Sequence, residues 1–155
     1  MPKNLFDLTG KIALVTGAGR GLGRGIARGL ADHGAAVVLN DLGEAQLEKA
    51  VATIRGDGGT VHTQTFDVSD QAAVTAGVEE IESRVGPIAI LVNNAGIQRR
   101  HPLESFPVED WRKVIDMNLT SPFIVSKAVA PGMIKRRRGK IINVEKARLP
   151  RVLQN

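Results

Sequence analysis

The 155-residue chain contains no cysteine and no tyrosine, and aromatic residues make up only 3% of it. Without cysteine, disulfide bonds and thiolate metal sites are excluded, and we expect no bound metal. No apolar run approaches the roughly 18 residues that a membrane-spanning helix requires. The first residues also lack the apolar run and small-residue cleavage site of a signal peptide. We therefore expect a soluble protein of the cytoplasm with no membrane partner.

The formal net charge of +5 is not spread evenly along the chain. Residues 1–134 carry 13 Lys and Arg against 15 Asp and Glu, whereas residues 135–155 carry eight against one. A basic run at the end of a helix commonly complements the helix dipole and lies in solvent. We therefore expect no nucleic-acid partner, and a nucleic-acid patch is the less favoured interpretation.

Short apolar runs alternate along the chain with segments of helical periodicity. The apolar runs predict buried strands, and apolar positions repeated every three or four residues predict helices. In the first helix, Leu22, Ile26 and Leu30 form one apolar face. Repeated strand–helix–strand units predict an α/β fold with a doubly wound parallel sheet. The predicted strands cover residues 11–16, 36–40, 60–66, 88–92 and 139–144, and the predicted helices cover 22–33, 44–56, 70–85 and 108–137, the last bent near Pro122.

A glycine-rich turn at residues 17–23 follows the first strand and opens the first helix. Glycines there let the backbone bend sharply and let a pyrophosphate approach the free N–H groups of the helix start. The spacing differs from the plain G-x-G-x-x-G, because Leu22 and Arg24 stand where its third glycine would fall. The pattern present over residues 16–23 is T-G-x-x-x-G-x-G. A flexible turn without a ligand is the alternative interpretation.

Three further motifs follow in order: Asp67-Val68 after the third strand, residues 93–96 (NNAG) after the fourth, and Asn118 in the last helix. With the glycine turn, they resemble the motifs of the short-chain dehydrogenase/reductase superfamily, over residues 7–144. The resemblance implies a Rossmann-type sheet of five strands in the order 3-2-1-4-5, within a dinucleotide-binding domain at residues 1–144. Residues 145–155 form an unrelated basic tail. Family members form homo-oligomers, and the state of this chain is left undecided.

The resemblance also implies which residues hold the dinucleotide and which take part in catalysis. Asn118 matches the helix asparagine of the family's catalytic tetrad. Asp67 and Val68 match the pair that contacts adenine. The implied cofactor-binding residues are Gly17, Gly19, Arg20, Gly21, Leu22, Gly23, Asp41, Leu42, Asp67, Val68, Asn94, Ala95 and Gly96.

Two residues give opposing indications of which dinucleotide is bound. Asp41 ends the second strand, 18 residues after Gly23, where an acid accepts hydrogen bonds from the adenosine ribose and repels a 2′-phosphate. Arg20 precedes Gly21, where a basic residue in the family often meets the 2′-phosphate of NADP. Because a repulsive charge close to the phosphate outweighs a mobile arginine, we favour NAD, and NADP stays open. A turn or helix-capping role is the alternative for Asp41.

Residues 93–102, NNAGIQRRHP, resemble the gluconate 5-dehydrogenases of the family, which interconvert D-gluconate and 5-keto-D-gluconate. Arg99 and Arg100 follow the fourth strand, where substrates enter such sheets. A guanidinium there can bind a sugar-acid carboxylate in bidentate fashion. We favour Arg100 for this role and expect His101 to be structural. A solvated loop with two surface charges is the alternative.

The family's catalytic base, a tyrosine, is missing from this chain. Hydride transfer at an alcohol needs such a base, and a lysine four residues later lowers its pKa. The position matching the family's serine holds Lys146, and the resemblance ends at Val144. We hypothesise a frameshift or alternative end, which sequencing the gene would test, and expect no catalysis. An active enzyme, a residual nucleotide-binding module and a non-functional gene product stay open as alternatives.

The family's sheet continues beyond the fifth strand, and this has consequences for packing. Without those elements, we expect Ile141, Ile142 and Val144 to lie on an unpaired edge with an uncovered face. We also expect Val125 and Val129 in the last helix to be less covered. Marginal stability is the predicted result.

Overall fold

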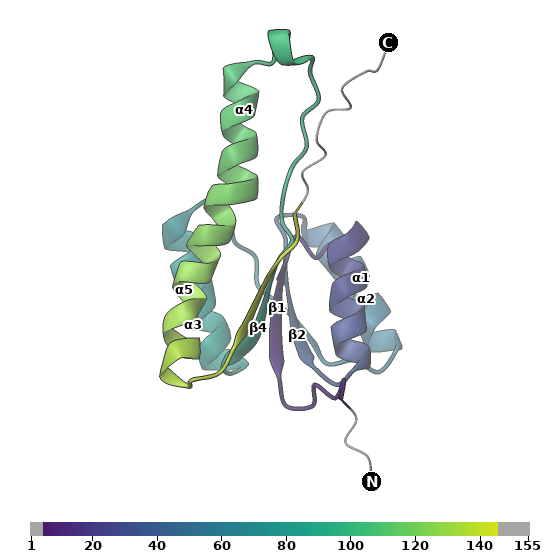
Figure 1. The fold of residues 1–155 in the computed structure, drawn as a ribbon. Helices are drawn as coiled ribbons and strands as arrows, with labels where there is room; N and C mark the ends of the chain where they lie inside the picture. Colours follow the sequence, from purple (N-terminus) through teal and green to yellow (C-terminus); the bar gives the residue numbers. More distant parts are fainter. Residues whose placement is uncertain (1–4, 146–155) are drawn as a thin grey trace.

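The computed structural model describes residues 5–145, which form a five-stranded parallel sheet with helices on both faces (Figure 1). The strand order β3-β2-β1-β4-β5 confirms the predicted one. The strands are β1 (Ile12–Thr16), β2 (Ala36–Asn40), β3 (Val61–Thr63), β4 (Ile88–Asn93) and β5 (Lys140–Asn143). The helices are α1 (Gly21–Asp32), α2 (Glu44–Gly56), α3 (Gln71–Arg84), α4 (Val108–Ile115) and α5 (Ser121–Lys135), with a 3-10 turn η1 (Leu103–Ser105) and a π-helical turn η2 (Asp116–Thr120). Of the predicted tail 145–155, all but Glu145 lies outside the described residues, Lys146 included.

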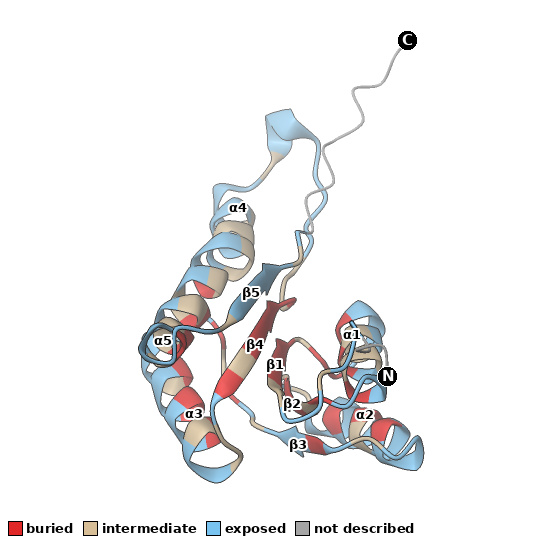
Figure 2. Cartoon of the chain, turned by 60° about the horizontal axis from the view of Figure 1, so that its bottom comes forward, coloured by how far each residue is buried: buried red, intermediate tan, exposed pale blue. Residues whose placement is uncertain are grey.

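Two apolar layers enclose the sheet, one beneath α1 and α2 and the other beneath α3 and α5 (Figures 1 and 2). Successive residues of β1 serve opposite layers: Ala13 and Val15 pack with the first, and Leu14 packs with the second. Because both faces are covered, the central strands are apolar throughout rather than alternating. None of the helices within residues 5–145 is long and apolar enough to cross a membrane.

The buried face of α1 differs from the predicted one. Leu22 is 61% exposed, and Ile26 and Leu30 are only half-buried. A side chain on Gly23 would overlap the carbonyl oxygen of Gly17, so α1 lies too close to the glycine turn for larger residues there. The buried residues of α1 are Gly23, Ala27 and Ala31. The closest contact is therefore made by the small residues, and the predicted face is confirmed in part, since Ile26 and Leu30 pack against the same apolar layer while Leu22 does not.

The third strand is shorter than the predicted segment 60–66, and beyond Thr63 one backbone hydrogen bond, from the Gln64 N–H to the Leu39 carbonyl at 3.0 Å, is supplemented by a side chain. The Asn40 Nδ2 donates to the carbonyl oxygens of Gln64 at 3.1 Å and Phe66 at 3.0 Å. The chain therefore continues beside β2 to Phe66 without forming a strand. This holds the segment that leads to Asp67.

The predicted helix 108–137 is divided into α4 and α5 by the π-helical turn η2. Pro122 is the second residue of α5, and because it has no N–H it cannot donate back into η2 as the Ser121 N–H does to the Asp116 carbonyl. The Ser121 hydroxyl donates to the Met117 carbonyl at 2.6 Å and so satisfies a backbone group at the break. Figure 1 shows that α4 extends beyond the end of the sheet, beside the loop that follows β4.

The prediction that Val125 and Val129 would be poorly covered is wrong, since each is 1% exposed. Both face the sheet and belong to the apolar layer shared with α3. The exposed apolar residues of α5 are instead Phe123 and Ile134, which lie on other sides of the helix. The packing of α5 on β4 and α3 is therefore sufficient to bury its inner face.

Strand β5 is the open edge that the sequence predicts. Within the described residues it pairs with β4 alone, and Ile141 and Ile142 are 40% and 48% exposed (Figure 2). Val144 is half-buried, because it packs against the first apolar layer and its N–H donates to the Asn93 carbonyl at 2.9 Å. An unpaired edge with exposed isoleucines is a site for aggregation, so marginal stability stays a prediction.

Replacing Arg137 by glycine is expected to raise the free energy of unfolding by about 1 kcal/mol. Helix α5 ends in a Schellman motif, in which the Arg138 N–H donates to the Met133 carbonyl and the Arg137 N–H to Ile134. Arg137 has a φ of 51°, a left-handed conformation that only glycine adopts without strain. Urea denaturation measures the change. Arg138→Gly is the control and should bring no gain; equal stability of Arg137→Gly and wild type would contradict the expectation.

Candidate functional site

A cavity of about 350 Å³ lies at the edge of the sheet where β1, β2 and β4 end. Because the strands are parallel, the loops that follow their carboxyl ends meet there, which is where doubly wound sheets bind ligands. The lining residues come from the glycine turn and the start of α1, from the segments at the ends of the next three strands, and from η2. They are Gly17, Arg20, Gly21, Leu22, Gly23, Asn40, Asp41, Leu42, Phe66, Asp67, Val68, Asn94, Ala95, Gly96 and Met117.

The glycine turn is packed so closely that its glycines are required. Gly17 has a φ of 63°, and a Cβ there would lie 2.8 Å from the Cα of Ala95. A Cβ on Gly23 would overlap both the Gly17 carbonyl and the Asn94 side chain. The turn leads directly into the N-terminus of α1, and Arg20 at its N-cap makes no side-chain cap hydrogen bond. The first N–H groups of α1 therefore form a site suited to an anionic group such as a pyrophosphate.

Thr16 and Asn94 tie the ends of β1 and β4 together below the turn. The Thr16 Oγ accepts from the backbone N–H groups of Asn94 and Ala95, each at 3.0 Å. The Asn94 Nδ2 donates to the carbonyls of Thr16 and Gly17, also at 3.0 Å. Within residues 5–145, the buried Oδ1 of Asn94 has no hydrogen-bond partner. It is an acceptor that a bound ligand or water can satisfy.

Asp41 joins the glycine turn to the loop after β2. Its Oδ2 accepts from the Gly19 N–H at 3.0 Å, and its Oδ1 accepts from Leu42 at 2.8 Å and Gly43 at 3.3 Å. The predicted alternative, a turn-capping aspartate, therefore describes part of what this carboxylate does. The same hydrogen bonds fix the carboxylate at the wall of the cavity, so one role does not exclude the other.

The structure brings the predicted dinucleotide residues together, with one exception. Gly19 does not line the cavity but binds Asp41. Asp67 lines it with Val68, and the Asp67 Oδ1 accepts from the N–H and the hydroxyl of Ser69 at 2.8 and 2.7 Å. Three residues that were not predicted also line it: Asn40, Phe66 and Met117. A polar residue ending an apolar strand was the available signal for Asn40.

The side chain of Asn118 holds a loop rather than the cavity wall. Its Oδ1 accepts from the Ile97 N–H and its Nδ2 donates to the Ile97 carbonyl, both at 2.9 Å. Asn118 lies in η2, so this pair fixes the π-helical turn against the loop after β4. Its neighbour Met117 reaches the cavity. The asparagine therefore acts on the site through the backbone that it positions.

Arg99 and Arg100 are exposed and do not line the cavity. The Arg99 Nε lies 4.0 Å from the Asp110 carboxylate, and Arg100 donates to the Gln98 side chain at 3.1 Å. His101 hydrogen-bonds Asp110 at 2.9 Å, as a structural residue would. Asp110, in α4, thus fixes the base of the loop that carries both arginines.

The short chain dehydrogenase family matches residues 11–147 of this chain. The chain belongs to that family. The resemblance inferred from its motifs is thereby confirmed, and the cavity of the chain lies where its glycine turn, Asp67 and Asn94 meet.

Several relatives of the chain carry names that refer to sugar acids. It is 50% identical over 141 residues to the gluconate 5-dehydrogenase of Gluconobacter oxydans, covering 91% of this chain and 55% of the relative. It is 43% identical to the 5-keto-D-gluconate 5-reductase of Escherichia coli over 141 residues, covering 91% and 56%. A gluconate 5-dehydrogenase from Burkholderia cenocepacia, solved with NADP and tartrate, superposes with a TM-score of 0.85 at 48% identity, covering 92% and 58%. The chain thus spans little more than half the length of these relatives.

Proposed function

We propose that this chain binds a nicotinamide adenine dinucleotide at the carboxyl edge of its sheet. The observation that carries the proposal is the cavity in which the glycine turn and the N-terminus of α1 face Asp41 and Asp67. Such a site suits a pyrophosphate beside an adenosine. We assign this binding to residues 1–144 and give residues 145–155 no part in it.

We further propose that NAD binds more tightly than NADP. The ionisable residues lining the cavity are Arg20, Asp41 and Asp67, so the acids outnumber the base. Three N–H groups hold the Asp41 carboxylate in place, which prevents it from turning away from a 2′-phosphate. Against this, Arg20 is exposed and free to reach a phosphate, and the relative from Burkholderia cenocepacia was solved with NADP.

Thermal denaturation in the presence of each dinucleotide tests both proposals. A ligand at 100 times its Kd stabilises the folded state by about 2.7 kcal/mol, so NAD should raise Tm at lower concentration than NADP. Asp41→Asn keeps the shape of the side chain but removes its charge, and it should reduce or reverse the preference for NAD over NADP. Arg112→Ala, on the exposed surface of α4, is the control. If neither dinucleotide raises Tm, the proposed function fails.

We propose that the relatives' reaction, hydride transfer between a sugar acid and the dinucleotide, is not completed by these 155 residues. The chain has no tyrosine to act as base, and the Asn118 side chain is bound to Ile97. Arg100 stays our first choice for a sugar-acid carboxylate, with Arg99 beside it. We expect no NADH formation from gluconate and NAD, followed by absorbance, even when NAD is bound. Measurable turnover would show that another group supplies the base.

A further inference from the structure

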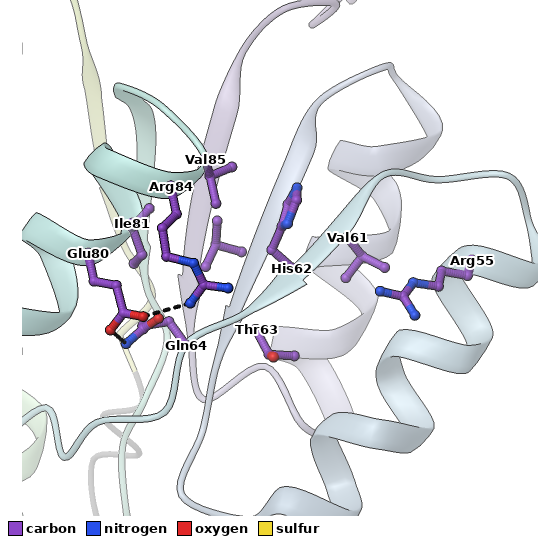
Figure 3. Close-up of a pocket in the computed structure, with 10 residues that line it drawn as sticks. Arg55, Val61, His62, Thr63, Gln64, Glu80, Ile81, Arg84 and Val85 are labelled. Carbon is purple, nitrogen blue, oxygen red and sulfur yellow. Dashed lines mark hydrogen bonds and ion pairs between the residues drawn. The ribbon is translucent and has the colours of Figure 1, made fainter.

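A second cavity, of about 360 Å³, lies at the outer edge of β3 (Figure 3). It shares no lining residue with the dinucleotide cavity. Its floor is apolar, from residues such as Val38 and Ile81, and its size falls within the range of small-molecule sites. The polar residues around it come from α2, from β3 and the residue after it, and from α3, and they are Arg55, His62, Thr63, Gln64, Glu80 and Arg84.

One side of this groove is fixed by Glu80. Its Oε1 accepts from Arg84 at 2.6 Å and its Oε2 accepts from the Gln64 Nε2 at 2.8 Å. These hydrogen bonds, that from Arg84 first and that from Gln64 second, lower the pKa of Glu80. The carboxylate is therefore ionised at neutral pH, and it holds the Arg84 guanidinium at the rim.

Arg55 and His62 also border the groove. Within residues 5–145, neither Arg55 nor His62 has a side-chain hydrogen bond or an ion pair. Figure 3 shows the guanidinium of Arg55 extending from α2 toward β3, on the opposite side of the strand from that of Arg84. Both arginines occupy the last turn of their helices, where a cation complements the helix dipole. The dipole accounts for a charge at each helix end, but not for two side chains that border one cavity.

We propose that the β3 groove binds a small anion with carboxylate or phosphate groups, held between Arg55 and Arg84. A guanidinium presents parallel N–H donors that match either group. Glu80 occupies only part of the Arg84 donor set, and the unpaired Arg55 supplies the other half of the site. Since both arginines are exposed, binding is weak, and it weakens further as salt screens the charges.

Nuclear magnetic resonance titrations of the full chain with inorganic phosphate and, separately, with succinate test this proposal. The amides of residues 61–64 report the groove, and those of residues 17–23 report any anion bound at the glycine turn. Arg55→Ala and Arg84→Ala should each raise the groove Kd about threefold and the double variant about tenfold, as expected for exposed charge pairs. Whichever anion has the lower Kd, phosphate or succinate, shows which anionic group the groove prefers.

The exposed Arg112→Ala variant is the control and should leave the groove Kd unchanged. Arg84→Ala also breaks the contact with Glu80, so Arg55→Ala, which breaks no ion pair within residues 5–145, is the decisive variant. Shifts confined to residues 17–23, or an Arg55→Ala Kd equal to that of wild type, would overturn the proposal. So would binding of an acidic extended peptide to β3 without binding of either small anion.

Discussion

Replacing Gly23 by alanine is expected to abolish dinucleotide binding and to lower the free energy of unfolding by about 3 kcal/mol. The added Cβ would overlap the Gly17 carbonyl and the Asn94 side chain. Neither can yield, because the Asn94 amide is bonded to the Thr16 and Gly17 carbonyls. The helix must therefore move away from the turn, which separates its N–H groups from the cavity. Urea denaturation and NAD titration measure the two effects.

Gly25 and Gly29 in the same helix provide matched controls. A Cβ at either position would meet no atom within 4 Å outside the helix's own backbone. Alanine there removes the entropic cost of glycine in a helix and should raise the free energy of unfolding by about 0.5–1 kcal/mol. A Gly23→Ala variant as stable as these two would mean that α1 does not depend on close approach to the turn.

Replacing Asn94 by aspartate is expected to destabilise the fold by about 3 kcal/mol or more at neutral pH. Asn94 is 2% exposed, and its Nδ2 donates to two carbonyl oxygens. Aspartate exchanges that donor for a negative charge facing the same two acceptors, while its burial denies it water. Dinucleotide binding should be lost as well, since the Gly17 carbonyl is no longer held.

The pH dependence of this variant separates charge from shape. Burial and the facing carbonyls raise the pKa of the introduced carboxyl in the folded state. Its destabilising effect is therefore greatest at neutral pH and decreases as the pH falls toward the unfolded value, because the protonated carboxyl donates one hydrogen bond. Asn94→Ala is the control: it loses both hydrogen bonds without a charge and should show no such recovery. Equal pH profiles for the two variants would refute a role for charge.

Features that depend on neighbours in sequence could be predicted, and those that depend on distance between elements could not. The T-G-x-x-x-G-x-G turn is a local pattern, and the strand order was implied by the family resemblance that such motifs carry; the structure and the family comparison bear both out. The inner face of α1 was misjudged because hydropathy carries no information on how near a helix lies to its sheet. Glycine and alanine at that face indicate a close approach only after Gly23 is seen against Gly17.

Hydrogen bonds from side chains to distant backbone groups could not be predicted from sequence patterns either. Asn118 matches a catalytic position, yet its amide holds Ile97, 21 residues earlier. Likewise, nothing near Asn40 in the sequence indicates that its amide would bind the carbonyls of Gln64 and Phe66. Val125 was expected to lose cover, but α3 and β4 suffice to bury it.

The central place of β1 in the sheet affects how long the glycine turn keeps its conformation. The two open edges of the described sheet belong to β3 and β5, and β1 lies between them, paired on both sides. Local opening begins where backbone hydrogen bonds face solvent, so the amide hydrogens of the edges should exchange in brief openings that leave the centre closed. Those of β1 should exchange only when the whole molecule unfolds. The glycine turn therefore follows directly on the strand that opens last. Local openings at β3 or β5 leave β1, which holds the start of the turn, in place.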